Sequence, residues 1–507
     1  MRIYGCFIRL HTGETGDPML LRLPAEMILC LFFAFPPSQA AQAQIGTPAL
    51  PDTPAGRRVE AFLAAFNSGD VSQLERFFVA STNPQSAAAR PPAQRALRLQ
   101  GVRQELGSVK LRKVEVQSPD SITVFVEGER GQLLGIGFRF EPGPERWLGG
   151  LTIDEATAED LAEPPPPMTE AEALAALDRA IEQAVAADEF SGAVLIARQG
   201  KTVFLKAWGL ASKEFNAPNR PDTRFNLGSI NKIFTRIAIA QLAERGKLSL
   251  DDRIGKHLSD YPNREAAAKV TIRQLLEMQS GIGGFFGSKF DSTPKNRFRR
   301  NADFLPMFTD QPLAFPPGTQ RQYSNGSYVV LGEIIARASG QDYYDYVRER
   351  LFAPAGMKDT DSYEADVPVT NLAEGYTRNW DDVDRTSGPR RTNIYTRPAR
   401  GSAAGGGYST APDLLRFTEA LISDGLLSPP YTDWVLTGAE PRQGQGRRAG
   451  APPGGSLGIA GGAPGINAEL EFDVATRDTV IVMSNYDAPA AMEIAKKARR
   501  IIGVIRE

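Results

Sequence analysis

Runs of strand-forming residues stand at both ends of a largely helical stretch, and this order constrains the fold more than any other feature of the chain. Two strand-like runs rich in apolar residues, Ala193–Ala197 and Thr202–Trp208, come first, and two more, Ala468–Val474 and Thr479–Ser484, come last. The residues between them read mostly as helices and loops. We therefore predict one antiparallel sheet assembled from both chain ends, with a helical insert and a groove between sheet and insert.

A smaller unit precedes this region. Residues 54–80 have helical spacing of apolar side chains, and four strand-like segments follow, over residues 111–116, 121–126, 132–140 and 147–153. We expect a small α+β domain over residues 50–160, a proline-rich linker over 161–168 and the main domain over 169–507. The small domain loosely resembles the cone-shaped ketosteroid-isomerase-like fold. No acid and base converge in its sequence, so a structural or recognition role is expected.

The N-terminal residues have the pattern of an export signal. Arg22 precedes the apolar run Met27–Phe35, and small residues up to Ala43 offer a cleavage site, so residues 1–43 are predicted to be a signal peptide. The mature protein would be periplasmic or secreted, with no stable membrane span; a short membrane anchor is the alternative. Both cysteines, Cys6 and Cys30, fall within the predicted signal, which leaves no disulfide in the mature chain.

Charge and histidine content exclude several function classes. The 58 Lys and Arg residues nearly balance the 60 Asp and Glu residues, for a net charge of −2, so nothing indicates nucleic-acid binding. The two histidines, His11 and His257, are too few for a histidine-rich zinc site or a histidine-based catalytic triad. His257 is expected in a loop, and no metal or cofactor is predicted.

A serine and a lysine three residues apart form the first candidate catalytic motif. Ser229 and Lys232 stand where a strongly apolar helical stretch begins, so a helix would bring hydroxyl and amine together. A partly desolvated lysine has a lowered pKa and can take the proton of a serine hydroxyl. The same spacing recurs at Ser292 and Lys295, but Pro294 interrupts it and no helical run follows.

A tyrosine near an asparagine forms the second candidate motif. Tyr323 and Asn325 supply it, and a tyrosine beside a lysine ammonium is expected to favour its phenolate and to carry protons. The asparagine amide can donate to a substrate carbonyl. A similar pair, Tyr261 and Asn263, lies in a proline turn, and a half-buried structural tyrosine is the alternative reading of Tyr323.

Six stretches in order resemble the serine β-lactamase and penicillin-binding-protein superfamily, in particular its class C-like hydrolases and esterases. The resemblance covers residues from about 190 to 503. It rests on Phe225-Asn-Leu-Gly-Ser-Ile-Asn-Lys232, Leu275-Leu-Glu-Met-Gln-Ser-Gly-Ile282, Phe315-Pro-Pro-Gly-Thr-Gln-Arg-Gln-Tyr-Ser-Asn325, Leu351-Phe-Ala-Pro-Ala-Gly-Met357, Gly401-Ser-Ala-Ala-Gly-Gly-Gly-Tyr-Ser-Thr410 and Met483-Ser-Asn-Tyr486.

The resemblance implies a β-lactamase/transpeptidase-like α+β fold and a covalent acyl-serine mechanism. It makes Ser229 the nucleophile, Lys232 its base, Tyr323 a general acid and base, and Asn325 a substrate-orienting group. The backbone N–H of Ser229 would form one half of an oxyanion hole, and Gly461 and Gly462 would contribute the other. The glycine-rich stretch Gly401–Gly407 is expected to be a close-packed turn lining the site, since it lacks the features of a nucleotide-binding loop.

One residue departs from the family pattern. Ile459 stands where the family usually has a lysine or histidine, which anchors a substrate carboxylate. Arg447 or Arg448 could replace that cation. Without it, small neutral ester or amide substrates are favoured over penicillins and D-Ala-D-Ala peptides, which carry a carboxylate.

The sequence thus predicts an exported serine hydrolase that acts on a small-molecule or peptide-like substrate, with esterase activity favoured. A β-lactamase or D-alanyl-D-alanine carboxypeptidase is one alternative. A non-catalytic binding or scaffold protein that retained the fold is the other, and Ile459 is the best argument for it.

Overall fold

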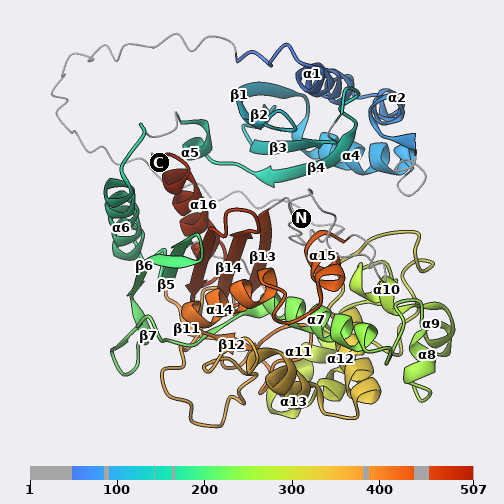
Figure 1. Cartoon of the computed structure of the whole chain (residues 1–507), viewed down its shortest axis with the longest axis vertical. Coiled ribbons are helices and arrows are strands. Elements are labelled where there is room, and N and C mark those ends of the chain that lie inside the picture. The colour runs from blue at the N-terminus through green and yellow to red at the C-terminus, as the bar shows by residue number, and fades with distance from the viewer. Residues whose placement is uncertain are drawn as a thin grey trace, which may run out of the picture. The chain divides into compact units, whose positions relative to one another are not determined.

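The computed structural model describes residues 48–84, 91–141, 143–162, 166–380, 387–438 and 456–505. The predicted signal peptide, with Cys6, Cys30 and His11, lies outside the described residues, as do Arg447 and Arg448. The chain divides within the proline run at Pro164 and Pro165 into two compact units. Figure 1 shows the helices and strands of each unit.

In its described residues, the N-terminal unit consists of a four-stranded antiparallel sheet and three longer helices. Its helices are α1 (Pro54–Asn67), α2 (Val71–Ser81), α4 (Pro92–Leu106) and the short α5 (Ala158–Leu161). Its strands β1 (Val109–Ser118), β2 (Ser121–Gly128), β3 (Leu133–Phe140) and β4 (Leu148–Glu155) pair in sequence order. All four predicted strands are present. Helix α4 was not predicted, because only Ala96, Leu99 and Leu106 of its fifteen residues are buried and its apolar pattern is weak.

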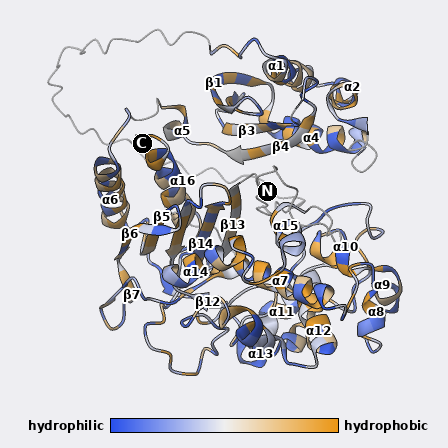
Figure 2. Cartoon of the chain, viewed as in Figure 1, coloured by the Kyte–Doolittle hydropathy of each residue, from blue (hydrophilic) through white to orange (hydrophobic). Residues whose placement is uncertain are grey.

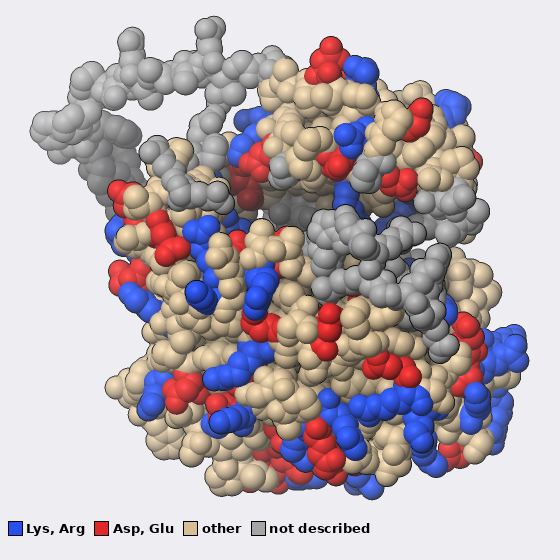
Figure 3. Space-filling model, viewed as in Figure 1, with Lys and Arg blue, Asp and Glu red and all other residues tan. Residues whose placement is uncertain are grey.

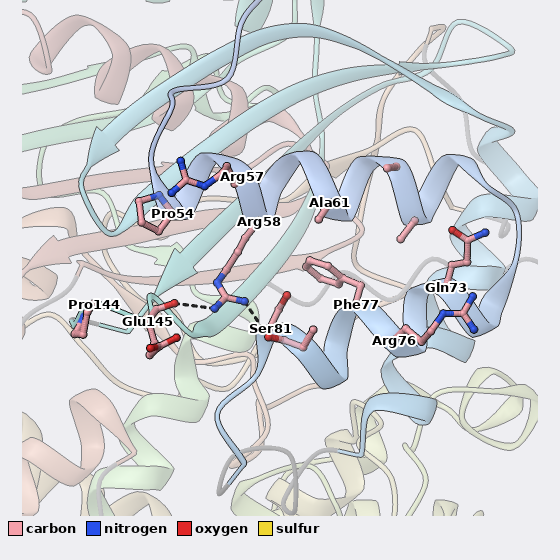
Figure 4. A pocket seen from close by; sticks show the side chains of 13 residues that line it. Pro54, Arg57, Arg58, Ala61, Gln73, Arg76, Phe77, Ser81, Pro144 and Glu145 are labelled. Carbon is pink, nitrogen blue, oxygen red and sulfur yellow. Dashed lines mark hydrogen bonds between the residues drawn. The ribbon is translucent and has the colours of Figure 1, made fainter.

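The interior of this unit is filled by aromatic side chains. Phe62 of α1 lies edge-on to Phe77 and Phe138, with ring centroids 5.5 and 5.1 Å apart. Between α1 and α2 a shallow groove of about 710 Å³ opens on the surface (Figure 4). Arg58 closes one end of it by donating to the carbonyl oxygens of Ala80 and Glu145 at 3.0 and 2.8 Å. Arg58 thereby ties α1 to the end of α2 and to the turn after β3.

The C-terminal unit is built on the predicted antiparallel sheet from both chain ends. Its order is β13-β14-β15-β5-β6, where β5 (Gly192–Arg198) and β6 (Lys201–Trp208) come early in the unit. The last strands are β13 (Ser456–Ala463), β14 (Ile466–Asp473) and β15 (Thr479–Ser484). β15 joins the two groups, since Ser484 pairs with Gly192 and Thr479 with Ala197. The structure therefore confirms the predicted α+β fold.

One face of this sheet is covered by two helices from opposite ends of the unit. They are α6 (Glu170–Ala186) and α16 (Ala490–Ile502), whose Ile181 and Ile494 pack against Val194 and Val482 (Figure 1). The predicted capping box begins α6: Glu172 N donates to Thr169 Oγ1, and Thr169 N donates to the Glu172 carboxylate. Figure 2 colours α16 with both hydrophobic and hydrophilic residues, and its buried residues, such as Ile494 and Ala498, are apolar.

The helical layer on the other face surrounds α7 (Asn231–Glu244). Alternate strand residues such as Leu195 and Ile481 point into this layer. Phe234 of α7 lies 5.0 Å from the rings of both Phe352 and Phe417. Around α7 lie α8 (Ile254–His257), α9 (Arg264–Lys269), α10 (Ile272–Leu276), α11 (Ser288–Ser292), α12 (Asn325–Ser339), α13 (Tyr343–Val347), the π-helical turn Arg348–Phe352, α14 (Ala411–Ile422) and α15 (Pro429–Thr437), with 3₁₀ turns over Gly228–Ile230, Lys295–Arg297 and Asn301–Met307.

Three two-stranded sheets join segments near the helical layer. They pair β7 (Leu210–Ser212) with β8 (Ala217–Pro218), β9 (Phe225–Asn226) with β12 (Tyr408–Ser409), and β10 (Tyr376–Thr377) with β11 (Arg391–Thr392). The loop prediction for His257 was wrong. It ends α8, and its Nε2 lies 2.9 Å from the Asp252 carboxylate.

Charges are mixed on the visible surface. Lysine and arginine side chains are interspersed with acidic ones in Figure 3, as the near-zero net charge predicts. Within the ranges that the structure describes, no helix combines the length and apolar character needed to span a membrane.

Candidate active site

Ser229 lies in a 3₁₀ turn that runs directly into α7. The turn covers Gly228–Ile230, and α7 begins at Asn231, so Ser229 and Lys232 are adjacent along the start of one continuous helical segment. Gly228 has φ +50°, a left-handed conformation that glycine adopts without Cβ strain, and its N–H donates to Asn226 Oδ1 at 2.9 Å. This local geometry places Ser229 at the N-terminal end of α7.

The structure brings the four predicted polar side chains into one hydrogen-bonded group. Lys232 Nζ donates to Ser229 Oγ at 3.0 Å, to Asn325 Oδ1 at 2.8 Å and to the carbonyl oxygen of Ala404 at 2.5 Å. Ser229 Oγ and the Tyr323 hydroxyl share a hydrogen bond of 2.5 Å. The serine oxygen is therefore held between an amine and a phenol, as proton transfer to and from it requires.

The environment of Lys232 favours a neutral amine. Its side chain is buried, and its three acceptors are neutral oxygens. Burial lowers the pKa of Lys232 to about 7, because an ammonium loses its hydration inside the protein. A substantial fraction of Lys232 is thus unprotonated near neutral pH and can accept the serine proton.

Tyr323 differs from the expectation drawn from the sequence. Burial raises the pKa of its phenol, and the hydrogen bond with Ser229 only partly opposes that shift. Lys232 Nζ lies over the face of the ring, 4.9 Å from the centroid, so its charge is not directed at the phenolic oxygen. The predicted phenolate is therefore disfavoured, and a neutral phenol, able to donate a proton, faces the serine.

Two contacts of Met278, one through its backbone and one through its side chain, hold the Tyr323 segment in place. Gln322 N donates to the carbonyl oxygen of Met278 at 2.9 Å, and Ser324 N donates to its sulfur at 3.3 Å. Ser324 then caps α12, whose first residue is Asn325. Sequence reasoning assigned no role to Met278, although it lies in one of the six matched stretches; its left-handed φ of +60° is not visible in the sequence.

Gly461 and Gly462 lie on β13, the edge strand next to the serine turn. A Cβ on Gly461 would overlap the carbonyl oxygen of Leu227 and lie 2.9 Å from Ser229 N. A Cβ on Gly228 would lie 2.8 Å from Gly462 N. The two backbones therefore touch, and this contact is possible only because glycine stands on both sides of it.

The register of β13 indicates which N–H groups face the serine. Ala463 pairs with Ile466 across the two-residue turn Pro464–Gly465, which makes that pair hydrogen-bonded. Antiparallel pairs alternate, so the next pair, Gly462 with Asn467, leaves Gly462 N–H pointing away from β14. The N–H groups of Ser229 and Gly462 therefore both lie at the contact between the serine turn and β13.

The stretch Gly401–Gly407 lies against the other side of the serine turn. A Cβ on Gly405 would lie 3.0 Å from the carbonyl oxygen of Gly228, and Gly406 N donates to that oxygen at 3.3 Å. Ala404, in the same stretch, supplies the third acceptor of Lys232. This stretch is thus a close-packed turn that lines the site, and it orients the lysine as well.

A pocket of about 170 Å³ opens above the serine. Its lining includes the serine with Tyr323 and Asn325, an aromatic wall formed by Phe285, Phe286 and Phe304, and the β13–β14 turn. The remaining lining residues are Asn226, Gly228, Tyr363, Thr396, Arg397, Pro398, Ala399, Gly401, Ser402, Ala404, Gly405, Gly406, Tyr408, Gly462, Ala463, Pro464 and Ile466. It is a mainly apolar cavity with few polar groups, as small-molecule sites usually are.

Ile459 does not line this pocket. It pairs with Leu470 on β14 and packs against the hydrophobic core of the unit. In the part of the chain that the structure describes, the charged side chain that does line the pocket is Arg397. Sequence reasoning missed it because Thr396–Pro398 belongs to no recognised motif.

The two pairs of residues that repeat the spacing of the candidate motifs have structural roles. Ser292 Oγ donates to the Lys289 carbonyl, and Lys295 Nζ donates to backbone carbonyls that include Phe290 at 2.6 Å. Tyr261 is buried in the core, and Asn263 caps α9 by accepting from Ala266 N at 2.9 Å. Among the described residues, no cluster of His, Cys, Asp or Glu side chains could hold a metal ion.

Comparison with known proteins matches the C-terminal unit. A family model described as Beta-lactamase covers residues 177–503. Penicillin-binding protein 4* of Bacillus subtilis (strain 168) is 28% identical over 337 residues, which span 62% of this chain and 72% of that protein. Esterase EstB of Burkholderia gladioli is 30% identical over 308 residues, or 54% of this chain and 78% of that protein.

Solved structures have the same fold. A penicillin-binding protein from Bacillus halodurans superposes with a TM-score of 0.55 at 29% identity, covering 64% of this chain and 99% of that one. D-amino acid amidase from Ochrobactrum anthropi SV3 has a TM-score of 0.55 at 23% identity, covering 66% of this chain and 98% of that one. This second likeness shows the fold alone.

Proposed function

This chain belongs to the beta-lactamase family of serine hydrolases, and from that premise we propose that it is an exported esterase or amidase that works through an acyl-serine at Ser229. The observation that carries the proposal is the hydrogen-bonded group of Ser229, Lys232, Tyr323 and Asn325 beneath an apolar pocket. Export is supported by the signal-like pattern of residues 1–43.

Acylation begins with proton transfer to the lysine. Neutral Lys232 accepts the proton of Ser229 while Oγ attacks the carbonyl carbon of the substrate, which converts the carbonyl to a tetrahedral oxyanion. The N–H groups of Ser229 and Gly462 donate to that oxyanion; loss of one such donor typically costs about 10²- to 10³-fold in rate.

Collapse of the tetrahedral intermediate releases the alcohol or amine. The Tyr323 phenol donates a proton to the leaving group and becomes a phenolate. The proton that Lys232 took from the serine then passes by way of Ser229 Oγ, which lies within hydrogen-bond distance of both groups, to the phenolate, so the charges balance. The amide oxygen of Asn325 is engaged by Lys232, which leaves its NH₂ to donate to the substrate. Water then attacks the acyl-serine, with the same groups acting in reverse, and frees the acid.

Labelling of Ser229 tests this function. A fluorophosphonate probe is expected to modify Ser229, as identified by peptide mass spectrometry, and Ser229→Ala is expected to lower p-nitrophenyl ester turnover by about three orders of magnitude or more. Ser292→Ala is the matched control, because Ser292 lies outside the pocket and should leave labelling and turnover intact. A folded wild-type protein that no serine-directed probe labels would support a non-catalytic scaffold instead.

A second candidate function is action on β-lactams or D-alanyl peptides. It is favoured by the likeness to proteins named penicillin-binding proteins, such as Penicillin-binding protein 4*. A chromogenic cephalosporin and a D-Ala-D-Ala peptide, tested beside short p-nitrophenyl esters, separate the two functions by their kcat/KM values.

A further inference from the structure

Among the described residues that line the active-site pocket, Arg397 is the one side chain with a formal charge. Its side chain is 12% exposed, so most of the guanidinium is withdrawn from bulk water. A cation in a mainly apolar pocket interacts with an anion more strongly than a surface cation does, because little solvent screens it.

The guanidinium is only partly used by the protein. One Nη donates to the Tyr408 hydroxyl at 2.6 Å, while the other lies 3.4 Å from both carboxylate oxygens of Glu374, near the limit of a hydrogen bond. Nε is buried and has no acceptor within the described part of the chain. A buried donor without an acceptor is costly, so this group has unused capacity to bind an acceptor.

The position of Arg397 is tied to the chemical centre on two sides. Tyr408, its hydrogen-bond partner, pairs with Asn226 on β9, directly before the serine turn. Asn393, whose carbonyl accepts from Arg397 N at 3.1 Å, donates its side-chain NH₂ to the Pro464 carbonyl in the β13–β14 turn at 2.9 Å. Hydrogen bonds and strand pairing therefore connect Arg397 both to β9, which precedes the serine turn, and to the β13–β14 turn.

We propose that Arg397 binds a carboxylate of the substrate, so that the preferred substrates are small esters or amides that carry a carboxylate away from the scissile bond. The planar guanidinium matches a carboxylate, and Ile459 leaves the usual cation position empty of charge. This proposal rests on the serine hydrolase function above. The sequence-based expectation was a neutral substrate; the proposal is an anionic substrate. Its carboxylate would be bound by Arg397 and not by a residue at the position of Ile459 on β13.

A pair of esters that differ only in charge tests the proposal. The mono-p-nitrophenyl ester of glutaric acid carries a free carboxylate, and its methyl ester caps that carboxylate. In the full-length wild-type protein, kcat/KM is expected to be higher for the free acid. Arg397→Gln should lower the acid-to-methyl-ester ratio at least tenfold through KM. Arg391→Gln, an exposed arginine that stacks on Trp380, is the matched control and should leave the ratio unchanged.

Removing the Glu374 carboxylate, which competes for the Arg397 guanidinium, should change the acid-to-methyl-ester ratio in the opposite direction. Glu374→Gln is expected to raise the ratio several-fold, because it frees the guanidinium from its weak partner. This variant keeps the test decisive if Arg397→Gln does not fold. Turnover of both esters with a ratio that moves in neither variant would overturn the role of Arg397 and leave the hydrolase function standing.

Binding without turnover separates the two proposals further. Glutarate should bind the Ser229→Ala protein in isothermal titration calorimetry, and adding Arg397→Gln should weaken that binding at least tenfold. Equal binding by both proteins would overturn the anion site. Failure of the wild-type protein to hydrolyse either ester, with glutarate binding retained and dependent on Arg397, would instead reject the hydrolase function and support the anion site.

Discussion

At the scale of single residues, Lys232 shows how burial prepares a side chain for chemistry. Three oxygen acceptors hold its amine in place, but none is a carboxylate, so no negative charge in its hydrogen-bond set offsets the cost of burying the ammonium. That cost is what lowers the pKa of Lys232 to about 7. In the proposed mechanism a lysine with this pKa accepts the serine proton readily near neutral pH and returns it later.

The pH dependence of hydrolysis follows from this pKa. Only the neutral amine accepts a proton, so kcat/KM should be lost as pH falls below about 7 and should reach a plateau above it. Asn325→Asp would place a carboxylate next to the amine, stabilise the ammonium and move this acidic limb upward by about one pH unit or more.

Initial rates with a neutral p-nitrophenyl ester, measured from about pH 5 to 9, check this prediction. Correcting for the spontaneous hydrolysis of the ester is essential above neutral pH. An acidic limb near the ordinary pKa of a carboxyl group, or one that does not respond to Asn325→Asp, would argue against Lys232 as the base.

At the scale of elements, the contact between edge strand β13 and the serine turn determines whether the proposed oxyanion hole can form. The serine turn and the strand meet backbone to backbone, with Gly228 on one side and Gly461 and Gly462 on the other. Any side chain at this contact would separate the two N–H groups that the proposed mechanism needs close together. Glycine is required here for close approach, because a Cβ on Gly461 would overlap Leu227.

Gly461→Ala tests this contact. The added methyl group must push β13 away from the turn, so kcat is expected to fall by about a hundredfold, as it does when catalytic groups are displaced by about 1 Å. Gly458→Ala on the same strand is the control, since a Cβ there would meet the Glu471 side chain at an ordinary 3.7 Å. Ester hydrolysis by the two variants, with circular dichroism to verify folding, decides the matter; equal activity would exclude the proposed role of the strand.

At the scale of the whole molecule, the two units have separate hydrophobic cores. The core of the N-terminal unit includes Phe62, Phe77 and Phe138, and its buried members all lie between residues 55 and 148. The core beneath the helical layer and the one beneath α6 and α16 are formed from residues 177–498. Separate cores predict separate cooperative unfolding, because each unit buries its own apolar surface.

Phe62→Ala tests this independence. Phe62 is fully buried among three other phenylalanine rings, so its truncation should destabilise the N-terminal unit by about 3–5 kcal/mol. We expect calorimetry to show two transitions, of which only one moves, while ester hydrolysis at 25 °C persists. A single transition that shifts as a whole, with loss of hydrolysis, would show that the units fold as one.

Much of the fold could be predicted because local patterns agree with it. Thr169 and Glu172 cap α6 as their spacing indicates, and Gly340 ends α12 in the left-handed conformation that glycine favours. Helix α4 escaped prediction because few of its residues are buried. Among the candidate site residues, Ser229 and Lys232 are neighbours on one helical segment, so their contact is a local property that spacing predicts.

By itself, the sequence determined that strands stand at both ends of a helical stretch, the family resemblance, and the identities of the four polar side chains Ser229, Lys232, Tyr323 and Asn325. Only the tertiary structure decided the protonation tendencies of these side chains and which other residues line the pocket. The pKa values of Lys232 and Tyr323 depend on burial by distant segments, which reversed the expectation of a phenolate. Likewise, Arg397 lines the pocket and Ile459 packs against the core because of chain packing between segments far apart in sequence, which no local pattern encodes.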